Sequence, residues 1–561
     1  MRKIILIFIF TLALFLRVYK LGSYPVGFLW DEAALGYNGY SILKTGRDEY
    51  GKFLPIIFKS FGDYKPGLYV YLTVPSIAIF GLNEFSVRLP SAVLGSLTVL
   101  VFYYLIKESL SGRFTQIDKR ISADSVPIVA AIFLTLSPWH INFSRGAWEV
   151  TVMIFLLVLG FYLVLKFLNT RKIKFFISLI VSLMFSLFAY QASKLLMPVL
   201  ALALFYFFRK YFEKTSSKIR IGFILFVLLS SFLFNILASL GGRNGRLKVM
   251  SIFSYPRSPK ETQDLISQDK RNKFDWVVFH SPPFYFARSV LERYLNHFSG
   301  KFLFISGDWS NPRNGILFQG VMYYLDLILL AVGLIYLAKK NRNSLENFMI
   351  FWLFFAPLPS ALTRDSISSI RSFSMVIPLI FIAGTGAIEL FSYLNERKGI
   401  FGYGLKLLLV FVYLALFIRL LDLYFVHDKF YNSANRLFGY KEMIDFVNSQ
   451  IVNKNKVIIS NKYGQPYIYF LFYSKYDPKS YQKVANLTKN PYGDVGEVER
   501  IGKIEFRKVE WPTDRFTKNS LFVGDEFELP IIDIVGQENI YFLKEIKYYN
   551  GNTAFRLVET K

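Results

Sequence analysis

The sequence lacks cysteine and contains only four histidines among its 561 residues. The absence of cysteine excludes disulfide bonds, zinc–thiolate sites, iron–sulfur clusters and thiol nucleophiles. Charged residues are also few, at 19% of the chain, against 53% hydrophobic residues. A soluble protein this apolar would need one very large core, whereas single cores stop growing at about 250–300 residues. The composition therefore excludes an ordinary soluble enzyme and indicates an integral membrane protein.

The apolar residues occur in runs of about 15–24 residues, close to the length of a membrane-spanning helix. Hydropathy predicts a polytopic all-α membrane domain with eleven transmembrane helices. No small-residue cleavage site follows the first run, so we expect it to remain as a helix and not to be removed as a signal peptide. The eleven predicted helices cover residues 4–19, 87–106, 126–141, 149–168, 174–190, 194–208, 220–240, 317–338, 346–361, 373–394 and 404–426.

Lys and Arg exceed Asp and Glu by 66 − 40 = 26 residues. Much of this excess lies in short connections between the predicted helices, and the positive-inside rule places those connections, with Arg2 and Lys3, in the cytoplasm. The basic residues are divided among separate loops, so we expect no nucleic-acid partner. We expect a multi-pass plasma-membrane protein with a cytoplasmic N-terminus. The basic connections are residues 107–120, 171–174, 209–220, 339–342 and 397–406.

Counting crossings from a cytoplasmic start places the remaining segments outside. Residues 21–86 form the first large external loop, and residues 241–315 form the second. From about residue 456 the chain changes to short β-rich pieces separated by turn residues, after an amphipathic stretch at 440–452. We therefore predict a transmembrane domain over 1–430 and a small extracytoplasmic α/β domain over 431–561.

Asp31 and Glu32 follow directly on the apolar segment Phe28–Trp30 in the first external loop. One interpretation is a capped juxtamembrane helix, because acids in a first turn favour the helix dipole. The other is that one carboxylate acts as a general base, or orients a substrate or a metal ion, just above the bilayer. A divalent cation is possible, but no spacing requires one.

Lys65 lies in the segment Gly62–Gly67, ahead of an apolar run that Pro75 and Gly81 interrupt. The interrupted run predicts a re-entrant or interfacial helix. Lys65 would then stand at the membrane surface, where its ammonium either pairs with a lipid phosphate or extends to ordinary headgroups.

Further charged residues occur in other predicted external connections. Arg145 and Glu149 are four residues apart, so they either pair on one helix or project into the same cavity as Asp31. Arg313 and Arg371 each lie near the outer end of a predicted helix, where an arginine holds phosphate or serves as an interfacial anchor. The topology predicted from loop charge alone places all these charged residues on the external side of the membrane.

Several motifs occur in an order that resembles a known family: Asp31-Glu32, then Asp63-Tyr64-Lys65-Pro66, Arg88-Leu89-Pro90, Ser144-Arg145 with Glu149, and Arg371. Over about residues 1–395 the sequence resembles the GT-C glycosyltransferases of the protein O-mannosyltransferase and aminoarabinose-transferase type. Members of this family transfer a sugar from a polyprenyl phosphate to an acceptor hydroxyl on the external side.

The resemblance implies roles for particular residues. Asp31 matches the catalytic base, Lys65 the lysine that contacts the donor phosphate, and Glu149 a second acidic position in the cavity. The aminoarabinose transferases have arginine three residues after the first aspartate, whereas this chain has Ala34. The histidine-rich motifs of the eukaryotic protein mannosyltransferases are absent as well.

The chemical requirements of sugar transfer from a phosphate can be stated without the family resemblance. A sugar phosphate needs cations for the leaving phosphate and a base for the incoming hydroxyl, and a single displacement inverts the anomeric carbon. The candidate catalytic residues are Asp31, Glu32 and Glu149, and the candidate phosphate ligands are Lys65, Arg145, Arg313 and Arg371. The acceptor can be a glycan, a lipid or a protein. The alternatives are a transporter or flippase of lipid-linked glycans, and a non-catalytic membrane component that binds a glycan.

Overall fold

The computed structural model describes residues 2–110, 125–239, 260–268, 274, 276–397, 400–488 and 496–561. Part of the predicted basic connection at 107–120 and part of the predicted loop at 241–315 lie outside the described residues. Contacts within the chain define two compact units. The first contains residues 1–13, 95–143 and 153–420, and the second contains residues 14–94, 144–152 and 421–561.

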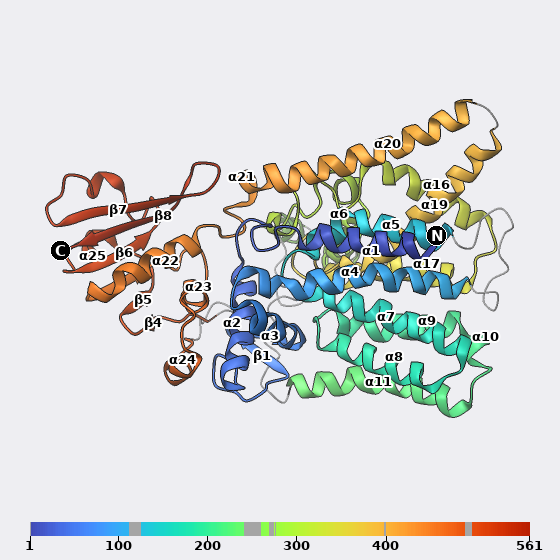
Figure 1. The fold of residues 1–561 in the computed structure, drawn as a ribbon, viewed down its shortest axis with the longest axis horizontal. Coiled ribbons are helices and arrows are strands. Elements are labelled where there is room, and N and C mark those ends of the chain that lie inside the picture. Colours follow the sequence, from blue (N-terminus) through green and yellow to red (C-terminus); the bar gives the residue numbers. More distant parts are fainter. Residues whose placement is uncertain are drawn as a thin grey trace. The chain divides into compact units, whose positions relative to one another are not determined.

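Helices make up most of the first unit (Figure 1). Each of the eleven segments predicted to span the membrane contains a helix. Four helices in the described residues are long and apolar enough to cross a membrane: Glu84–Ser109, Glu149–Thr170, Phe373–Glu396 and Ile400–Asn432. Four shorter apolar helices accompany them. The number of eleven crossings, and the side that each loop faces, remain predictions.

The helical bounds in order are α1 Arg2–Val18, α4 Glu84–Ser109, α5 Ser125–Leu136, α6 Pro138–Phe143, α7 Glu149–Thr170, α8 Ile173–Leu187, α9 Ser193–Phe207, α10 Arg209–Phe212, α11 Ser217–Ser239, α13 Lys260–Gln268, η2 Trp276–His280, α15 Pro282–Asn296, η3 Lys301–Ser306, η4 Pro312–Asn314, α16 Tyr324–Lys339, α17 Ser344–Phe355, α18 Leu358–Ala361, η5 Phe373–Met375, α19 Val376–Glu396 and α20 Ile400–Asp422. Helices α1, α4, α7 and α20 continue from one unit into the other.

Helix α19 lies in the middle of the first unit, packed on α5 and α16. Gly386 brings the backbone of α19 against the Leu329 carbonyl of α16, where any side chain would collide. Helix α20 is equally apolar, yet only 6% of its most apolar stretch is buried within the protein. An apolar helix that the protein leaves uncovered suits a lipid environment.

The first loop of the second unit holds α2 Trp30–Thr45, strands β1 Ile57–Ser60 and β2 Asp63–Pro66, and α3 Leu68–Phe80. The two strands form an antiparallel hairpin. Its two turn residues, Phe61 and Gly62, both have positive φ, as a two-residue hairpin turn requires. Helix α3 contains Pro75 and ends at Gly81, so a helix does form where the interrupted apolar run predicts one.

The C-terminal part of the same unit is built around a six-stranded mixed sheet in the order β4-β5-β3-β6-β8-β7. Strand β3 is parallel to β5 and to β6, and the remaining pairs are antiparallel. The predicted C-terminal α/β domain is therefore present. Its elements are η6 Leu423–His427, α21 Asp428–Asn432, α22 Tyr440–Gln450, η7 Ile451–Asn453, β3 Lys456–Ile459, α23 Pro466–Tyr473, α24 Pro478–Val484, β4 Arg500–Ile501, β5 Ile504–Phe506, α25 Trp511–Asp514, β6 Ser520–Gly524, η8 Ile531–Asp533, β7 Ile540–Lys547 and β8 Thr553–Thr560.

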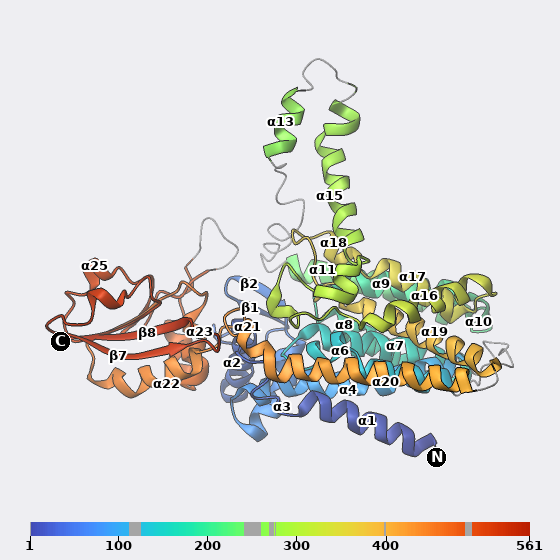
Figure 2. The same cartoon turned by 90° about the horizontal axis from the view of Figure 1, so that it is seen from above.

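Both faces of the sheet are covered. On one face Ile458, Phe522 and Val558 pack with Trp511 of α25 and with Leu529. Helix α22 lies on the other face, where its Tyr440 ring contacts Phe555. Figure 2 shows α22 and α25 on opposite sides of the sheet. Burial on both faces explains why β6 has five buried residues in succession and does not alternate.

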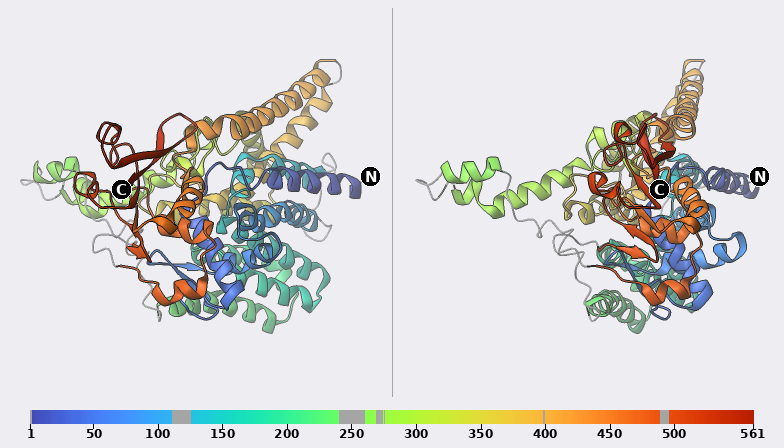
Figure 3. Two further views of the ribbon diagram at one scale, coloured as in Figure 1. Left: turned by 60° about the vertical axis from the view of Figure 1, so that its left-hand side comes forward. Right: turned by 90° about the vertical axis from the view of Figure 1, so that its left-hand side faces the viewer.

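The C-terminal sheet domain packs against the first loop, within the same compact unit. The Tyr469 hydroxyl of α23 donates to the Phe28 carbonyl at 2.7 Å, and the Tyr37 hydroxyl of α2 donates to the Tyr476 carbonyl at 3.1 Å. In Figure 3 orange helices of this domain lie beside the blue segment that contains α2, which packs on α23 and α24. The C-terminal domain is therefore a support for the loop that carries Asp31.

Candidate active site

The Asp31 carboxylate and the Lys65 ammonium form an ion pair. Asp31 lies in the first turn of α2, and Lys65 lies on β2 opposite Phe58 of β1. The hairpin places Lys65 and Phe58 on one face and Lys59 and Tyr64 on the other, since neighbouring residues of a strand alternate. The two residues that the sequence singled out as base and phosphate ligand therefore meet.

A pocket surrounds this pair. Helix α2 contributes one of its faces, with spacings of three and four residues from Asp31 to Asn38. The side chain of Asp31 is 30% exposed, whereas that of Lys65 is 12% exposed and lies 5.9 Å from the Phe61 ring centroid. Asp31 is thus reachable from outside, and Lys65 is largely enclosed. The pocket is lined by Asp31, Ala34, Leu35, Asn38, Phe58, Ser60, Lys65, Pro66 and Val70.

Ala34 forms part of the pocket wall. This is the position at which the resemblance to the aminoarabinose transferases expects an arginine. Among the residues that line the pocket, Lys65 is the one cation.

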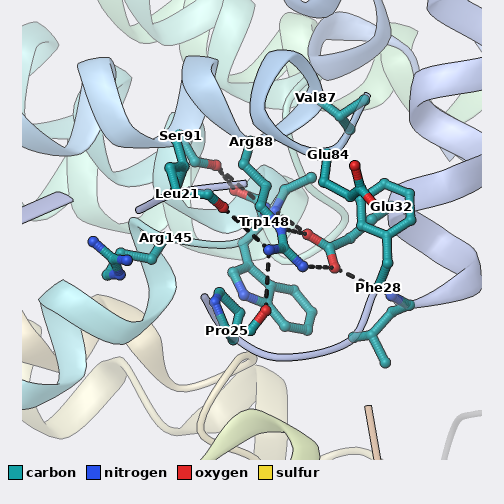
Figure 4. Close-up of polar contacts among 12 residues, drawn as sticks. Leu21, Pro25, Phe28, Glu32, Glu84, Val87, Arg88, Ser91, Arg145 and Trp148 are labelled. Carbon is teal, nitrogen blue, oxygen red and sulfur yellow. Dashed lines mark hydrogen bonds and ion pairs between the residues drawn. The ribbon is translucent and has the colours of Figure 1, made fainter. Parts of the chain in front are cut away.

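Glu32, next to Asp31, has a different environment because its carboxylate is buried and ion-paired with Arg88 (Figure 4). Arg88 donates from Nε to Oε1 at 2.9 Å and from NH2 to Oε2 at 3.1 Å. The backbone N–H groups of Leu29 and Ala147 donate to the same carboxylate. Glu32 therefore caps α2, as one of the two sequence interpretations proposed, and joins three chain segments.

Arg88 uses its remaining hydrogen-bond donors on backbone carbonyls. It donates to Leu21 and Pro25 from NH1 and to Gly27 from NH2. These bonds hold the segment between α1 and α2. Arg88 belongs to the motif Arg88-Leu89-Pro90, but the sequence indicates no role for it, because its partner Glu32 is 56 residues away.

Arg145 is also completely buried. Its guanidinium donates to the carbonyls of Leu16 and Tyr19, both at 2.7 Å, and lies 5.0 Å from the Phe425 ring centroid. In Figure 4 it points away from the Glu32 carboxylate. Of the two interpretations of Arg145 and Glu149, pairing on one helix does not hold, because α7 begins at Glu149 and Arg145 lies in the preceding turn.

The two other predicted phosphate ligands belong to the first unit. Arg371 forms an ion pair with Asp365 and donates to the Thr363 hydroxyl at 3.0 Å. Arg313 lies in the short helix η4, and Asp308 nearby accepts from the Ser369 N–H at 2.8 Å. Burial raises the pKa of Asp308, although its hydrogen bonds oppose the shift. Asp308 thus joins two loops of the first unit.

A second acid lies behind the pocket and was not identified from the sequence. Glu49 is fully buried in the loop after α2, where it accepts from Asn38 Nδ2 at 3.1 Å. The Glu49 N–H donates in return to Asn38 Oδ1 at 3.0 Å. Burial raises the pKa of Glu49 to about 8, although the Asn38 hydrogen bond opposes the shift. Asp48-Glu49 and Asp31-Glu32 look alike in sequence, but the buried Glu32 pairs with Arg88, whereas the buried Glu49 accepts from Asn38.

The carboxylates do not fit a divalent ion held by Asp31 and Glu32 together. Asp31 is paired with Lys65, and both oxygens of Glu32 accept from Arg88 and from backbone N–H groups. Calcium and magnesium need several free oxygen ligands. The described residues also contain no group of three His, Cys, Asp or Glu side chains placed to hold a metal ion.

No protein-family model matches the sequence. A comparison with curated proteins also gives no significant match.

Among solved structures, the chain is similar to ArnT from Cupriavidus metallidurans bound to undecaprenyl phosphate, with 10% identity and a TM-score of 0.52. The match covers 99% of this chain and 97% of ArnT. The archaeal oligosaccharyltransferase from Archaeoglobus fulgidus matches at 13% identity and a TM-score of 0.46, over 84% of this chain. This chain spans less than two thirds of the oligosaccharyltransferase, at 64% of its length. The fold of the chain over its whole length is therefore the GT-C fold of ArnT, which confirms the fold that the sequence resemblance predicted.

Proposed function

We propose that this protein is a membrane glycosyltransferase that moves a sugar from a polyprenyl phosphate to an acceptor hydroxyl. The observation that carries the proposal is the Asp31–Lys65 pair in one pocket, on a chain that shares its fold with ArnT. The solved ArnT structure holds undecaprenyl phosphate, which is the carrier that a polyprenyl-phosphate sugar would release as its leaving group. We also propose that the pocket faces the extracytoplasmic side of the plasma membrane.

In the proposed mechanism, Asp31 accepts the proton of the acceptor hydroxyl as the oxygen attacks the anomeric carbon. Its carboxylate is the more exposed member of the pair, so an incoming hydroxyl reaches it. The bond between the anomeric carbon and the phosphate oxygen breaks as the new glycosidic bond forms. A single displacement inverts the configuration at that carbon.

Lys65 binds the donor phosphate in this mechanism. Its ammonium is largely enclosed, and a charge pair in such surroundings is stronger than in bulk water. When the phosphate arrives, it replaces Asp31 as the partner of Lys65 and leaves the Asp31 carboxylate available as a base. The positive charge then stabilises the phosphate that leaves.

We assign Glu32, Arg88 and Arg145 to positioning, in place of the direct roles that the sequence suggested for two of them. Their polar atoms are used within the protein, on backbone groups and on one another. They fix the segment before α2 and hence the place of Asp31. Glu149, Arg313 and Arg371 keep the roles predicted for them as proposals.

The test is conversion of a polyprenyl-phosphate sugar by the purified protein in detergent, with a total membrane lipid and glycan extract as the source of acceptor. Mass spectrometry follows the donor, the released polyprenyl phosphate and the glycosylated product. A transporter has no second compartment in detergent and leaves the donor unchanged, so donor consumption distinguishes an enzyme from a transporter.

Asp31→Asn and Lys65→Ala should each abolish conversion in a folded protein. Two matched variants serve as controls: Lys59→Ala changes the lysine on the other face of the same hairpin, and Asp445→Asn changes an exposed aspartate of α22. Normal turnover by Asp31→Asn would remove Asp31 from the mechanism. No conversion by the wild-type protein would reject the proposed function.

A further inference from the structure

The C-terminal sheet contains a change of winding direction between β3 and its two parallel neighbours. After β3 the chain passes to α23, whose Phe470 ring contacts Phe506 of β5. After β5 it passes to α25, whose Trp511 packs with Ile458. Phe506 pairs with Ile459, so Phe506 and Ile458 lie on opposite faces of the sheet. In open α/β sheets, such a point leaves a crevice at the carboxyl ends of the strands, where ligands bind.

One carboxylate fixes the three strand ends that border this point. Glu528 accepts from the Ser460 hydroxyl after β3 at 2.9 Å, from the Val509 N–H after β5 at 3.3 Å, and from the Asp525 N–H after β6 at 3.3 Å. Glu528 is buried, so its bonds are shielded from water. The carboxyl ends of β3, β5 and β6, which we call the carboxyl edge of the sheet, are therefore held in fixed positions, as a binding site requires.

The loops that follow β3 and β6 carry polar and aromatic side chains at this carboxyl edge. Lys462, which follows β3, forms an ion pair with Asp525, which follows β6, and the Tyr463 hydroxyl donates to Asp525 at 3.1 Å. The Lys462 ammonium lies 4.9 Å from the ring centroid of Phe527. The Phe527 side chain is 78% exposed and that of Lys462 is 43% exposed. A large exposed aromatic ring beside the exposed Lys462 ammonium is typical of a recognition surface, whereas the Asp525 carboxylate that pairs with Lys462 is buried.

The loop after β3 also contacts Trp30, the residue before Asp31. Gly464, two residues after Lys462, has a φ of +118°, and a Cβ there would lie 2.5 Å from the Trp30 ring. Trp30 begins α2 and precedes Asp31. The Gln465 side chain donates to the Gly496 carbonyl at 3.1 Å, and the Gly496 N–H donates to the Phe61 carbonyl at the hairpin turn at 2.6 Å. The loop after β3 thus contacts α2 directly and is connected through Gly496 to the hairpin that carries Lys65.

We infer that the carboxyl edge of the sheet is the acceptor subsite, and that it binds a sugar of the acceptor. This inference rests on the proposed function, and it names the class of acceptor that the function leaves open. The Lys462 ammonium donates hydrogen bonds, and a sugar hydroxyl accepts them. A sugar hydroxyl therefore accepts from the exposed Lys462 ammonium, while the apolar face of the sugar ring covers Phe527.

The direct test is binding of the purified full-length protein to an array of immobilised mono- to tetrasaccharides. We expect the wild type to bind a subset of the saccharides. Phe527→Ser and Lys462→Ala should weaken that binding about tenfold, in keeping with the loss of one aromatic or charged contact. In the transfer assay the same two variants should raise the KM for the acceptor and leave the KM for the donor unchanged.

The domain offers a matched control for each change. Phe516 is 73% exposed, but it lies before the N-terminal end of β6, whereas Phe527 lies after the C-terminal end. Lys544 pairs with Glu442 beside the Phe446 ring. Phe516→Ser and Lys544→Ala should bind saccharides as the wild type does. Equal binding by wild type and Phe527→Ser, or no saccharide bound at all, would overturn the inference.

The outcomes also separate this inference from the proposed function. Donor conversion by the wild type, with saccharide binding absent or insensitive to Phe527→Ser, rejects the sugar subsite alone. Binding that depends on Phe527, without any conversion of donor, rejects the proposed function and leaves the subsite in place.

Discussion

The Lys65 ammonium contacts the Asp31 carboxylate although the two residues are 34 positions apart. The contact depends on the hairpin turn at Phe61 and Gly62, which returns the chain toward α2. The structure also places this pair within one unit with the C-terminal domain. Replacing Asp31 should therefore change how Lys65 binds polyprenyl phosphate.

Asp31→Asn should bind polyprenyl phosphate at least as tightly as the wild type, because Lys65 no longer has a carboxylate partner to release. Lys65→Ala should bind it about tenfold to a hundredfold more weakly, the range for a lost charged hydrogen bond. Native mass spectrometry with undecaprenyl phosphate measures both. If Asp31→Asn weakens binding as much as Lys65→Ala does, Asp31 serves only to orient Lys65.

Arg88→Ala should strongly destabilise the protein, by about 3–5 kcal/mol, because it leaves the Glu32 carboxylate buried without its counter-charge. Thermal unfolding in detergent measures the change. Lys508→Ala, which breaks an exposed pair with Glu510, is the control and should cost less than about 1 kcal/mol. A Glu32→Gln variant with wild-type stability and donor binding but no turnover would restore the catalytic role predicted from the sequence.

Arg145→Lys should lower thermal stability nearly as much as Arg145→Ala. A single ammonium does not reproduce the two parallel bonds to Leu16 and Tyr19 or the stacking on Phe425. Arg515→Ala, which removes a half-buried arginine beside Phe516, is the control. The opposite pattern, with full stability and a raised KM for the donor, would show that Arg145 binds phosphate.

Glu49→Gln should stabilise the protein at high pH. The folded protein raises the pKa of Glu49 to about 8 from the ordinary value of 4.5, so the folded state holds this proton more tightly than the unfolded state does. Stability from this group is complete below pH 4.5 and is lost as the pH rises to about 8.

Glutamine keeps the bond with Asn38 and does not ionise. The unfolding temperature of Glu49→Gln relative to wild type should therefore increase between pH 5 and pH 8.5, as differential scanning fluorimetry can measure. Asp48 also has a pKa raised by burial, but it is present in both proteins and does not enter the difference. A difference that does not change with pH would show that Glu49 is ionised throughout.

The sequence was informative wherever the determining pattern is local. Apolar runs of spanning length located a helix at each of the eleven predicted positions, and the β-rich tail indicated the C-terminal sheet. The Asp31-Glu32 and Lys65 motifs pointed to the pair that the structure brings together. The number of membrane crossings and the orientation of the protein remain predictions.

The sequence did not distinguish residues of the same type that face different surroundings. Asp31 and Glu32 are neighbours, yet one lines a pocket and the other is buried against Arg88. Arg145 is of a residue type that often binds phosphate, but its guanidinium donates to the backbone carbonyls of Leu16 and Tyr19.

The amino-acid sequence by itself determined that this chain forms apolar helices with a polar, acid-bearing first loop and a separate sheet domain, because helix and strand periodicity depend on neighbours in the chain. Only the tertiary structure decided which charges pair, since partners such as Glu32 and Arg88 are 56 residues apart and meet through packing. Only the tertiary structure, likewise, placed the edge of the C-terminal sheet against Trp30. Burial then distinguishes the charges: the buried Glu32 is satisfied within the protein, whereas the partly exposed Asp31 lines a pocket.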